Sequence, residues 1–391
     1  MVIRRNYFLP AIAAILLFVV LGPYFVWGLI SNDVFLGGVG AILAFLFLKN
    51  NEIKKNAKLF VFISFVMVLY CLTSGVSFFG FIFLGFSVFV AFGKEDFTKK
   101  TFNIFINIYA AILLISSLVW IGVLLGLVSP IGNIAPLNEL NTFDYTVYPL
   151  TVQMNSLYAF RFCGPFEEPG VIGTMNVILL FILDMNRKDW KTYALILSGA
   201  LSLSLFFYIG VFLFFLIKNI TKLRIIYLLI IALFIVAFYE VTKDNEILSE
   251  RVWERVEWNK EEGTFAGNNR MDYEADKIYE SKKWSLDWWI GDRNFNSYAS
   301  AFEGSSSYKV VVLRCGMICF ALYVLFFLLY AHKYCKGTKM LLFTVLFLTT
   351  IYQRPWMFGI GYFFLLPYYA RFNYNEGRIE NVKIGHSNHF S

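Results

Sequence analysis

Residues 161–169 read Arg-Phe-Cys-Gly-Pro-Phe-Glu-Glu-Pro and stand directly before an apolar run that begins near Gly170. The stretch places Arg161 and two adjacent carboxylates, Glu167 and Glu168, in a turn-rich loop at the start of an apolar helix. Because Gly and Pro limit the conformations open to the backbone, such a loop holds its charged groups in a fixed geometry. The pattern favours a site that grips an anionic substrate at a membrane surface. A structured loop with an ordinary interfacial arginine is the alternative.

The composition indicates a membrane protein. Of the 391 residues, 58% are hydrophobic and 16% are charged, and the mean hydropathy is +0.62. A hydrocarbon core about 30 Å thick needs roughly 20 apolar residues per helical crossing, and such runs recur along the chain. Backbone inside lipid must satisfy its own hydrogen bonds, and these runs are too long for barrel strands. The sequence therefore predicts an all-α polytopic membrane protein.

The net charge of +7 at pH 7 comes from short connections between the apolar runs. Lys and Arg cluster at residues 4–5, 49–58, 94–100, 187–191, 218–224 and 333–339. Short loops rich in these residues stay in the cytoplasm. The positive charge is thus a topological signal, and its distribution argues against a nucleic-acid-binding protein.

The basic loops define an expected path of about 11–12 membrane helices with both termini inside. Helices that cross once are expected near residues 8–30, 34–48, 59–73, 76–92, 102–128, 171–185, 225–241, 310–331, 340–351 and 357–369. Residues 192–217 have basic flanks on both sides but are too short for two full crossings. We interpret them as two half-crossings that meet around 198–204, a broken element tolerated where protein buries it. One long tilted helix is the alternative, and it would move the second large loop to the cytoplasm.

Five regions follow from this path. They are N-terminal membrane helices, a first outer loop, central membrane helices, a second outer loop, and C-terminal membrane helices with a cytoplasmic tail, at residues 1–128, 129–170, 171–241, 242–309 and 310–391. The second loop is long enough for a small helical cap, and apolar spacings near 3.6 predict helices at 244–262 and 270–284. Its tryptophans fit the lipid headgroup layer, with sugar stacking as the alternative for one or two of them.

The first outer loop resembles a known family. The pattern Arg161-x-x-Gly164-x-Phe166-x-x-Pro169, opening an apolar helix, resembles the signature of the Wzy-type O-antigen and capsular polysaccharide polymerases and of the related O-antigen ligases. The expected number of spans and the two large outer loops agree with that family along most of the chain.

The second outer loop carries the same resemblance. Asn269-Arg270, followed by a short helix and by Leu-Asp-Trp-Trp-Ile-Gly at 286–291, is similar to the family's second large outer loop. The spacing between Arg293 and Gly304 resembles an arginine–glycine spacing of some of these polymerases.

The resemblance implies a GT-C-like fold and a polymerase that joins polyprenyl-pyrophosphate-linked oligosaccharide repeats at the outer leaflet of the bacterial cytoplasmic membrane. It implies glycosyl transfer without metal or cofactor. The implied partners are the lipid-linked oligosaccharides, membrane lipid, a chain-length regulator and a flippase. The related ligases use a histidine in the second outer loop, whereas His332, His386 and His389 are all expected inside. This difference favours a polymerase over a ligase.

Under this interpretation arginines hold the pyrophosphate. A planar guanidinium donates two hydrogen bonds to one phosphate and keeps its charge. The reaction is accelerated only by binding energy that is present in the transition state and absent from the ground state. We expect Arg161 and Arg270 to act as clamps, with Arg293 next.

Three more cations lie on the expected outer side. Lys309 and Arg314 can complete a cationic pocket under the headgroup, with Arg314 about one turn inside a span that begins near Val310. A charge is costly at that depth, so a snorkelling anchor is the alternative for Arg314. Arg354, in the last outer turn beside Pro355, comes last among these candidates.

Attack by a sugar hydroxyl benefits from a general base. Glu167 and Glu168 are the carboxylates nearest to Arg161, and neighbouring arginines lower the pKa of a carboxylate, which keeps it ionised. Adjacent side chains point in different directions, so one of the two faces the site, and either can instead orient Arg161. Asp292 is a further candidate on the second loop.

Two other kinds of site are not expected. The outer face has no cluster of His, Cys and acidic residues with metal-ligand spacing. Of five cysteines only Cys163 is expected outside, so no disulfide framework holds the loops.

The rival class is a transporter, such as a flippase for lipid-linked sugars. Ion-coupled carriers keep ionisable groups at mid-membrane depth. The expected spans carry Asp184 and Arg314 only near their ends. The pattern disfavours ion coupling and leaves a passive scramblase open, whereas a structural scaffold would not explain charged outer loops with fixed turns.

Overall fold

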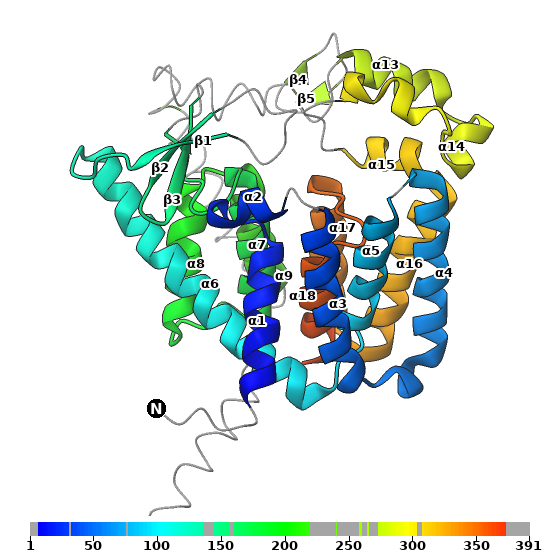
Figure 1. Cartoon of the computed structure of the whole chain (residues 1–391), viewed down its shortest axis with the longest axis horizontal. Helices are drawn as coiled ribbons and strands as arrows, with labels where there is room; N and C mark the ends of the chain where they lie inside the picture. The colour runs from blue at the N-terminus through cyan, green and yellow to red at the C-terminus, as the bar shows by residue number, and fades with distance from the viewer. Residues whose placement is uncertain are drawn as a thin grey trace, which may run out of the picture.

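The structure is a computed structural model. It describes residues 7–30, 33–75, 77–135, 144–155, 160–218, 240, 258–259, 264–265, 273–302 and 307–372. The chain is mostly helical, and its helices stand side by side in one bundle, with a small sheet and short helices gathered at the end away from the amino terminus (Figure 1). That end is called the outer end below, and the opposite end the inner end.

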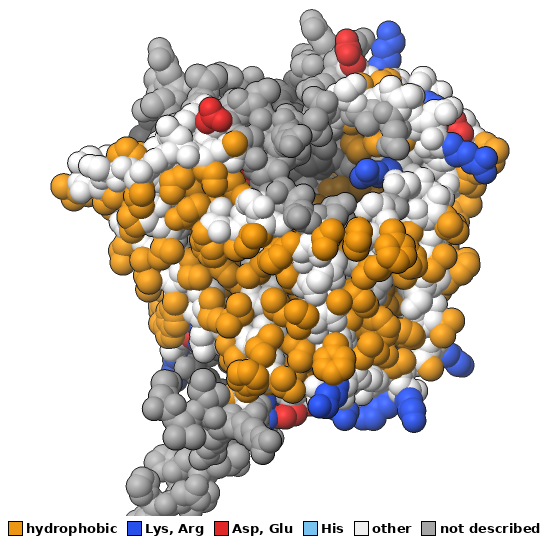
Figure 2. Space-filling view, in the orientation of Figure 1, with side chains coloured by type: hydrophobic (Ala, Val, Ile, Leu, Met, Phe, Trp, Pro, Cys, Tyr) orange, Lys and Arg blue, Asp and Glu red, His pale blue; other side chains and the backbone are white. Residues whose placement is uncertain are grey.

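Three stretches of the described chain are long and apolar enough to cross a membrane, at Ile53–Ser74, Glu95–Leu124 and Met317–Tyr334. Several shorter apolar helices lie beside them. Apolar side chains cover the bundle over most of its height, and Lys and Arg gather at the inner end (Figure 2). These features are those of a membrane-embedded helical protein.

The amino-terminal part supplies the first half of the bundle. Its elements are α1 (Phe8–Val20), η2 (Tyr24–Val26), α2 (Trp27–Ile30), α3 (Asp33–Lys49), η3 (Ile53–Asn56), α4 (Ala57–Ser74), α5 (Phe78–Val90) and α6 (Glu95–Leu124). One prediction is wrong here, because residues 8–30 do not form a single helix. Gly22, at φ +74°, and Pro23, which has no N–H, end α1 and turn the chain into the short helices η2 and α2.

The central part confirms the predicted break within residues 192–217. After α7 (Pro169–Ile182), the chain forms α8 (Trp190–Leu201) and α9 (Leu205–Lys218), joined by a turn in which Leu203 has φ +49°. Lys218, at the end of α9, forms an ion pair with Asp184 just beyond α7. The α8–α9 pair therefore begins and ends at the inner end of the bundle, and its turn lies at the outer end (Figure 1).

A buried polar cluster ties these helices together. Tyr109 on α6 donates a hydrogen bond of 3.1 Å to Asn176 Oδ1 on α7. The Asn176 amide in turn donates to Leu195 O and Ser198 Oγ on α8, each at 2.9 Å. Hydrogen bonds of this kind hold helices together in lipid, where the hydrophobic effect contributes little between them.

The first outer loop contains strands that the sequence interpretation did not include. Strands β1 (Gly132–Ile134), β2 (Tyr145–Tyr148) and β3 (Thr151–Met154) form an antiparallel sheet in the order β1-β2-β3, with Tyr145 opposite Met154. The aromatic and β-branched residues of β2, Tyr-Thr-Val-Tyr, favour a strand. On its buried side Tyr145 packs with Trp27, Val152 and Cys163.

The described part of the chain from Trp258 to Cys315 contains short helices and strands, which are called the cap below. Its elements are β4 (Trp258–Asn259), β5 (Thr264–Phe265), α13 (Tyr273–Lys282), α14 (Leu286–Ile290), η5 (Phe295–Ser297), η6 (Ala299–Phe302) and α15 (Tyr308–Cys315). Helix α13 lies within the predicted 270–284. The prediction of a helix at 244–262 is wrong at β4, which pairs with β5, and the rest of that stretch lies outside the described residues. The span predicted at 225–241 also lies outside the described residues, except for Glu240, which is helical.

The span predicted at 310–331 is not a single helix. It is divided where the cap and the bundle meet through close backbone contacts. Helix α15 ends at Cys315, and a separate helix, α16 (Met317–Tyr334), begins after Gly316 at φ +86°. A Cβ on Gly316 would lie 2.5 Å from Trp289 O, and one on Gly291 would lie 3.0 Å from Arg314 O. Only glycine permits this approach. Arg314 is therefore in the cap and not inside the span.

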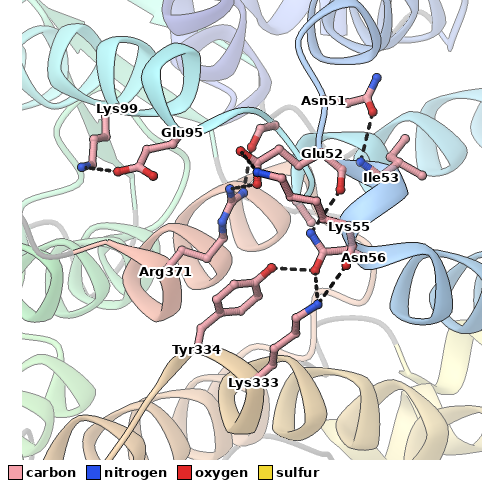
Figure 3. A network of polar contacts seen from close by, with 12 residues as sticks. Asn51, Glu52, Ile53, Lys55, Asn56, Glu95, Lys99, Lys333, Tyr334 and Arg371 are labelled. Atoms are coloured by element: carbon pink, nitrogen blue, oxygen red, sulfur yellow. Dashed lines mark hydrogen bonds and ion pairs between the residues drawn. The ribbon is translucent and has the colours of Figure 1, made fainter.

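The last helices are α17 (Thr338–Gln353) and α18 (Ile360–Arg371). At the inner end, Arg371 donates to Gly93 O at 2.7 Å and forms an ion pair with Glu52 at 3.1 Å. Close by, Lys333 and Tyr334 both donate to Asn56 Oδ1 at 2.6 Å. This network connects the ends of α16 and α18 with the segments that follow α3 and α5 (Figure 3).

Candidate functional site

The predicted loop at 161–169 lies at the outer end and is fixed from three sides. Pro165 O accepts from Tyr24 N at 2.7 Å, and Gly164 O accepts from Val152 N at 2.8 Å. Phe162 N donates to Leu201 O at 3.1 Å. Segments from η2, the sheet and α8 thus hold one loop, so its side chains have defined positions.

The apolar members of the motif are structural. Phe162 and Phe166 are buried, and the Phe166 ring stacks against Tyr109 with centroids 6.0 Å apart. Gly164 adopts φ +53°, and Pro169 opens α7, where its missing N–H costs nothing. Three polar positions remain for chemistry, Arg161, Glu167 and Glu168.

Arg161 caps a helix. Its Nε donates to Ser202 O at 3.1 Å and its Nη2 to Leu203 O at 3.3 Å. These carbonyls belong to the turn that ends α8, where unpaired carbonyls and the helix dipole favour a cation. The guanidinium predicted to clamp pyrophosphate therefore stabilises the α8–α9 turn.

Glu168 meets an arginine from a distant part of the chain. Its carboxylate forms an ion pair with Nη2 of Arg354, which lies between α17 and α18. The Arg354 side chain is 8% exposed, whereas that of Glu168 is 46% exposed. A Cβ on Gly170 would lie 2.5 Å from Arg354 Nη2, so the glycine makes room for the pair. Arg354, which ranked last among the candidates from the sequence, therefore contacts one of the two motif carboxylates.

Two buried donors beside these acids have no acceptor among the described residues. They are Nε of Arg354 and the hydroxyl of Tyr145. Burial, together with the charge of Glu167, raises the pKa of Tyr145, so its hydroxyl stays protonated and can donate. A buried donor without an acceptor costs about 1–3 kcal/mol, and each such case in a folded protein needs an explanation.

Electrostatics indicates that the motif charges converge. Burial raises the pKa of Cys163 to about 12, and the charge of Arg161 opposes that rise. Glu168 and Glu167 act on the same thiol. One buried group thus senses all three predicted residues. The neutral thiol is a packing residue and not a nucleophile.

Asp292 belongs to a separate, complete cluster in the cap. It is 2% exposed, forms an ion pair with Lys282, and accepts from Tyr298 and from Asn294 N, the last at 2.8 Å. Burial opposes its ionisation, but the hydrogen bonds from Lys282 and Tyr298 outweigh burial and lower its pKa. All three partners belong to the cap, so these contacts tie Asp292 to the cap's own structure.

The other predicted cations also lie in or beside the cap. Lys309 forms ion pairs with Asp276 and Glu280, the second at 3.8 Å. Arg293 is exposed, and exposed Arg314 lies 5.7 Å from the Phe295 ring centroid. Arg270 lies outside the described residues. Its role as a clamp stays a prediction.

The cap and the Arg354 turn are neighbours. The rings of Tyr308 on α15 and Tyr352 on α17 lie 6.0 Å apart, and Tyr352 precedes Arg354 by two residues. Arg354 thus lies between the motif loop and the cap, and His332 lies at the inner end, in the last turn of α16. Within the described residues no group of three or more His, Cys, Asp or Glu side chains is placed to hold a metal ion.

Comparison of the chain with protein-family models, with curated proteins and with solved structures finds no match in any of the three. The family resemblance therefore depends on the residues of the two outer loops.

The sequence analysis underestimated Arg354 and missed Tyr145. Arg354 precedes Pro355 and Trp356 in a short turn between two apolar helices, which was a usable signal. Tyr145 lies in a four-residue strand, and its proximity to the acids arises only from the fold.

Proposed function

We propose that the chain is a polysaccharide polymerase that joins polyprenyl-pyrophosphate-linked oligosaccharide repeats at the outer leaflet of a bacterial cytoplasmic membrane. The observation that supports it best is the gathering of Glu167, Glu168 and Arg354 at the outer end of an apolar bundle. The resemblance of the two loops to the Wzy-type polymerases supplies the reaction.

The reaction is a glycosyl transfer between two lipid-linked sugars. The growing chain on polyprenyl pyrophosphate is the donor, and a hydroxyl of the newly delivered repeat is the acceptor. A bond forms between the hydroxyl oxygen and the anomeric carbon, and the bond from that carbon to the pyrophosphate oxygen breaks. The hydroxyl proton passes to a carboxylate, and the pyrophosphate leaves with the bonding electrons.

The outer end offers groups for both tasks. A guanidinium stabilises the negative charge that grows on the leaving pyrophosphate, and a fixed donor does so without reorganisation. Glu167, which is partly exposed, and Glu168 are the candidate bases.

The wider arrangement is part of the proposal. The bundle spans the membrane about 11–12 times, with the α8–α9 pair as a broken element and the cap as a GT-C-like cover outside. Lipid-linked oligosaccharides and membrane lipid are its direct partners, and a chain-length regulator and a flippase act beside it.

Deletion of the gene, followed by electrophoresis of surface polysaccharide, tests the proposed reaction. A polymerase predicts that only single-repeat material remains. Finished polymer retained on its lipid would indicate a ligase, and an unchanged polymer pattern would rule out both. Complementation with wild type and with Glu167→Gln, at matched membrane levels, then separates loss of catalysis from loss of protein.

The orientation has a separate test. A cysteine at exposed Ser300 in the cap should react with an impermeant thiol reagent on intact cells. A cysteine at Lys55, whose side chain is 77% exposed at the inner end, should react only after permeabilisation. The reverse labelling pattern would place the cap in the cytoplasm and contradict an outer site.

A further inference from the structure

Arg354 holds its carboxylate partner with only part of its hydrogen-bonding edge. The terminal nitrogen Nη2, which binds Glu168, lies on the same side of the guanidinium as Nε, and these two N–H groups form a fork that fits two oxygens of one anion. Nε is buried and has no acceptor among the described residues. The pair with Glu168 therefore leaves half of a bidentate site unfilled.

The two partners differ in their freedom to move. The Arg354 side chain is 8% exposed, and it packs 5.1 Å from the Trp356 ring and against Gly170. The Glu168 side chain is 46% exposed and makes no capping bond to its own helix. An incoming anion can displace Glu168 while Arg354 stays in place.

A second donor lies beside the same acids. The Tyr145 hydroxyl is buried without an acceptor among the described residues, and both Glu167 and Glu168 act on it electrostatically. An anion of phosphate type has only acceptor oxygens at neutral pH, so it supplies what both donors lack.

We propose that Glu168 is a placeholder: two oxygens of the substrate's diphosphate replace it on the Nε–Nη2 edge of Arg354, with Tyr145 donating to the same group. This inference rests on the proposed function and deepens it. Arg354, and not Arg161, is then the residue that binds the diphosphate, because the Arg161 fork is bonded to the carbonyls that end α8. Displacement releases the Glu168 carboxylate at the moment when an acceptor hydroxyl needs a base.

If Glu168 is a placeholder, substitutions of the two members of the pair should change the affinity for the diphosphate in opposite directions. Arg354→Gln should weaken binding about tenfold or more, because it removes a charge-assisted contact. Glu168→Gln should tighten binding about two- to fivefold, because the carboxylate no longer competes. It should also lower polymer formation. A purely structural pair would give the same sign for both.

The experiment measures binding of sugar-free undecaprenyl diphosphate to the purified full-length protein in detergent, with phosphatidylglycerol as competitor. Glu52→Gln, which alters the ion pair with Arg371 at the inner end, is the matched control and should leave binding unchanged. Tyr145→Phe keeps the ring and removes only the donor, so it tests the site even where Arg354→Gln does not fold. It should weaken binding several-fold.

The outcomes separate the two proposals. Absence of undecaprenyl diphosphate binding by wild type would overturn the proposed function and this inference together. Binding by wild type, with equal losses in Arg354→Gln and Glu168→Gln or none in either, would overturn the placeholder alone. Equal displacement by phosphatidylglycerol would do the same, because the site would then hold ordinary lipid phosphates.

Discussion

Two buried arginines lie at opposite ends of the bundle and differ in how completely they are bonded. At the inner end Arg371 is 6% exposed, pairs with Glu52 and donates to Gly93 O. At the outer end Arg354 is 8% exposed and pairs with Glu168. Of these two arginines, only Arg354 has a buried nitrogen without an acceptor among the residues that the structure describes.

The difference separates an ion pair whose buried nitrogens are all bonded from the one that we propose binds a ligand. A buried charge is tolerated when its buried donors find acceptors, and no buried nitrogen of Arg371 lacks a partner in the described part of the chain. The outer pair meets it only in part. The same residue types at similar burial thus have different roles, and hydrogen-bond completeness distinguishes them where sequence does not.

The largest expected effect on stability comes from a substitution that breaks the ion pair at the inner end. Arg371→Gln leaves the partly buried Glu52 with only the exposed Lys55, 3.8 Å away, as a cation partner. Loss of the buried partner of such a pair costs about 3–5 kcal/mol. We expect a clear fall in the thermal unfolding midpoint of the purified protein. Lys55→Gln removes only the exposed cation of the same carboxylate, at a side chain that is 77% exposed, and as the control it should change little. A small effect of Arg371→Gln would mean that a complete network contributes no more than an incomplete one.

Substitution of Arg161 should give the next largest change in stability, and it adds a third arginine to the comparison. Arg161→Gln removes two charge-assisted bonds to the end of α8, and we expect a loss of about 2 kcal/mol. Its undecaprenyl diphosphate affinity, measured on the folded fraction, should stay near that of wild type. A selective loss of affinity without destabilisation would return Arg161 to the role of clamp.

Substitution of Asp292 tests whether another buried charge at the outer end is also incompletely hydrogen-bonded. Its folded pKa lies below its unfolded value, so its stabilising contribution is present above the unfolded pKa and is lost as pH falls through the folded pKa. Asp292→Asn should therefore destabilise the protein by about 1–2 kcal/mol at pH 7, and the difference from wild type should shrink as the pH falls below about 4. Unfolding midpoints of both proteins across that range provide the measurement. A difference that does not depend on pH would mean that the carboxylate charge is unimportant there.

Substitution of Tyr145 should give the smallest change in stability, and the direction of that change is informative. Removal of a buried hydroxyl that has no acceptor relieves a desolvation cost, so Tyr145→Phe should raise the stability of the ligand-free protein by up to about 1 kcal/mol. Tyr109→Phe, which removes a hydroxyl bonded to Asn176, should lower it and serves as the matched control. Destabilisation by both variants would show that Tyr145 has an acceptor after all.

Composition and the lengths of the apolar runs are enough to predict the helical membrane class and most helix positions, and the basic flanks of residues 192–217 are enough to predict the break between α8 and α9. The errors arise where short-range signals compete. Gly22-Pro23 divides one predicted span and Gly316 another, because in both cases a long apolar run hides a local stop. The strand at Tyr145 was missed because four residues carry little periodic signal.

The candidate site was harder to predict for a different reason. Residue type and order identified Arg161, Glu167 and Glu168, but not which of them find partners within the protein. Arg161 meets the end of a helix that starts some thirty positions later in the chain, and Glu168 meets Arg354, which is 186 positions away. Contacts at such separation follow from the tertiary fold, which no local pattern encodes.

The joint at Gly291 and Gly316 has a mechanical consequence. The main chain at the end of α14 contacts the main chain between α15 and α16 there, so no side chain separates the two segments. A side chain at either glycine would push the two main chains apart, so the position of α14 against the start of α16 depends on both glycines.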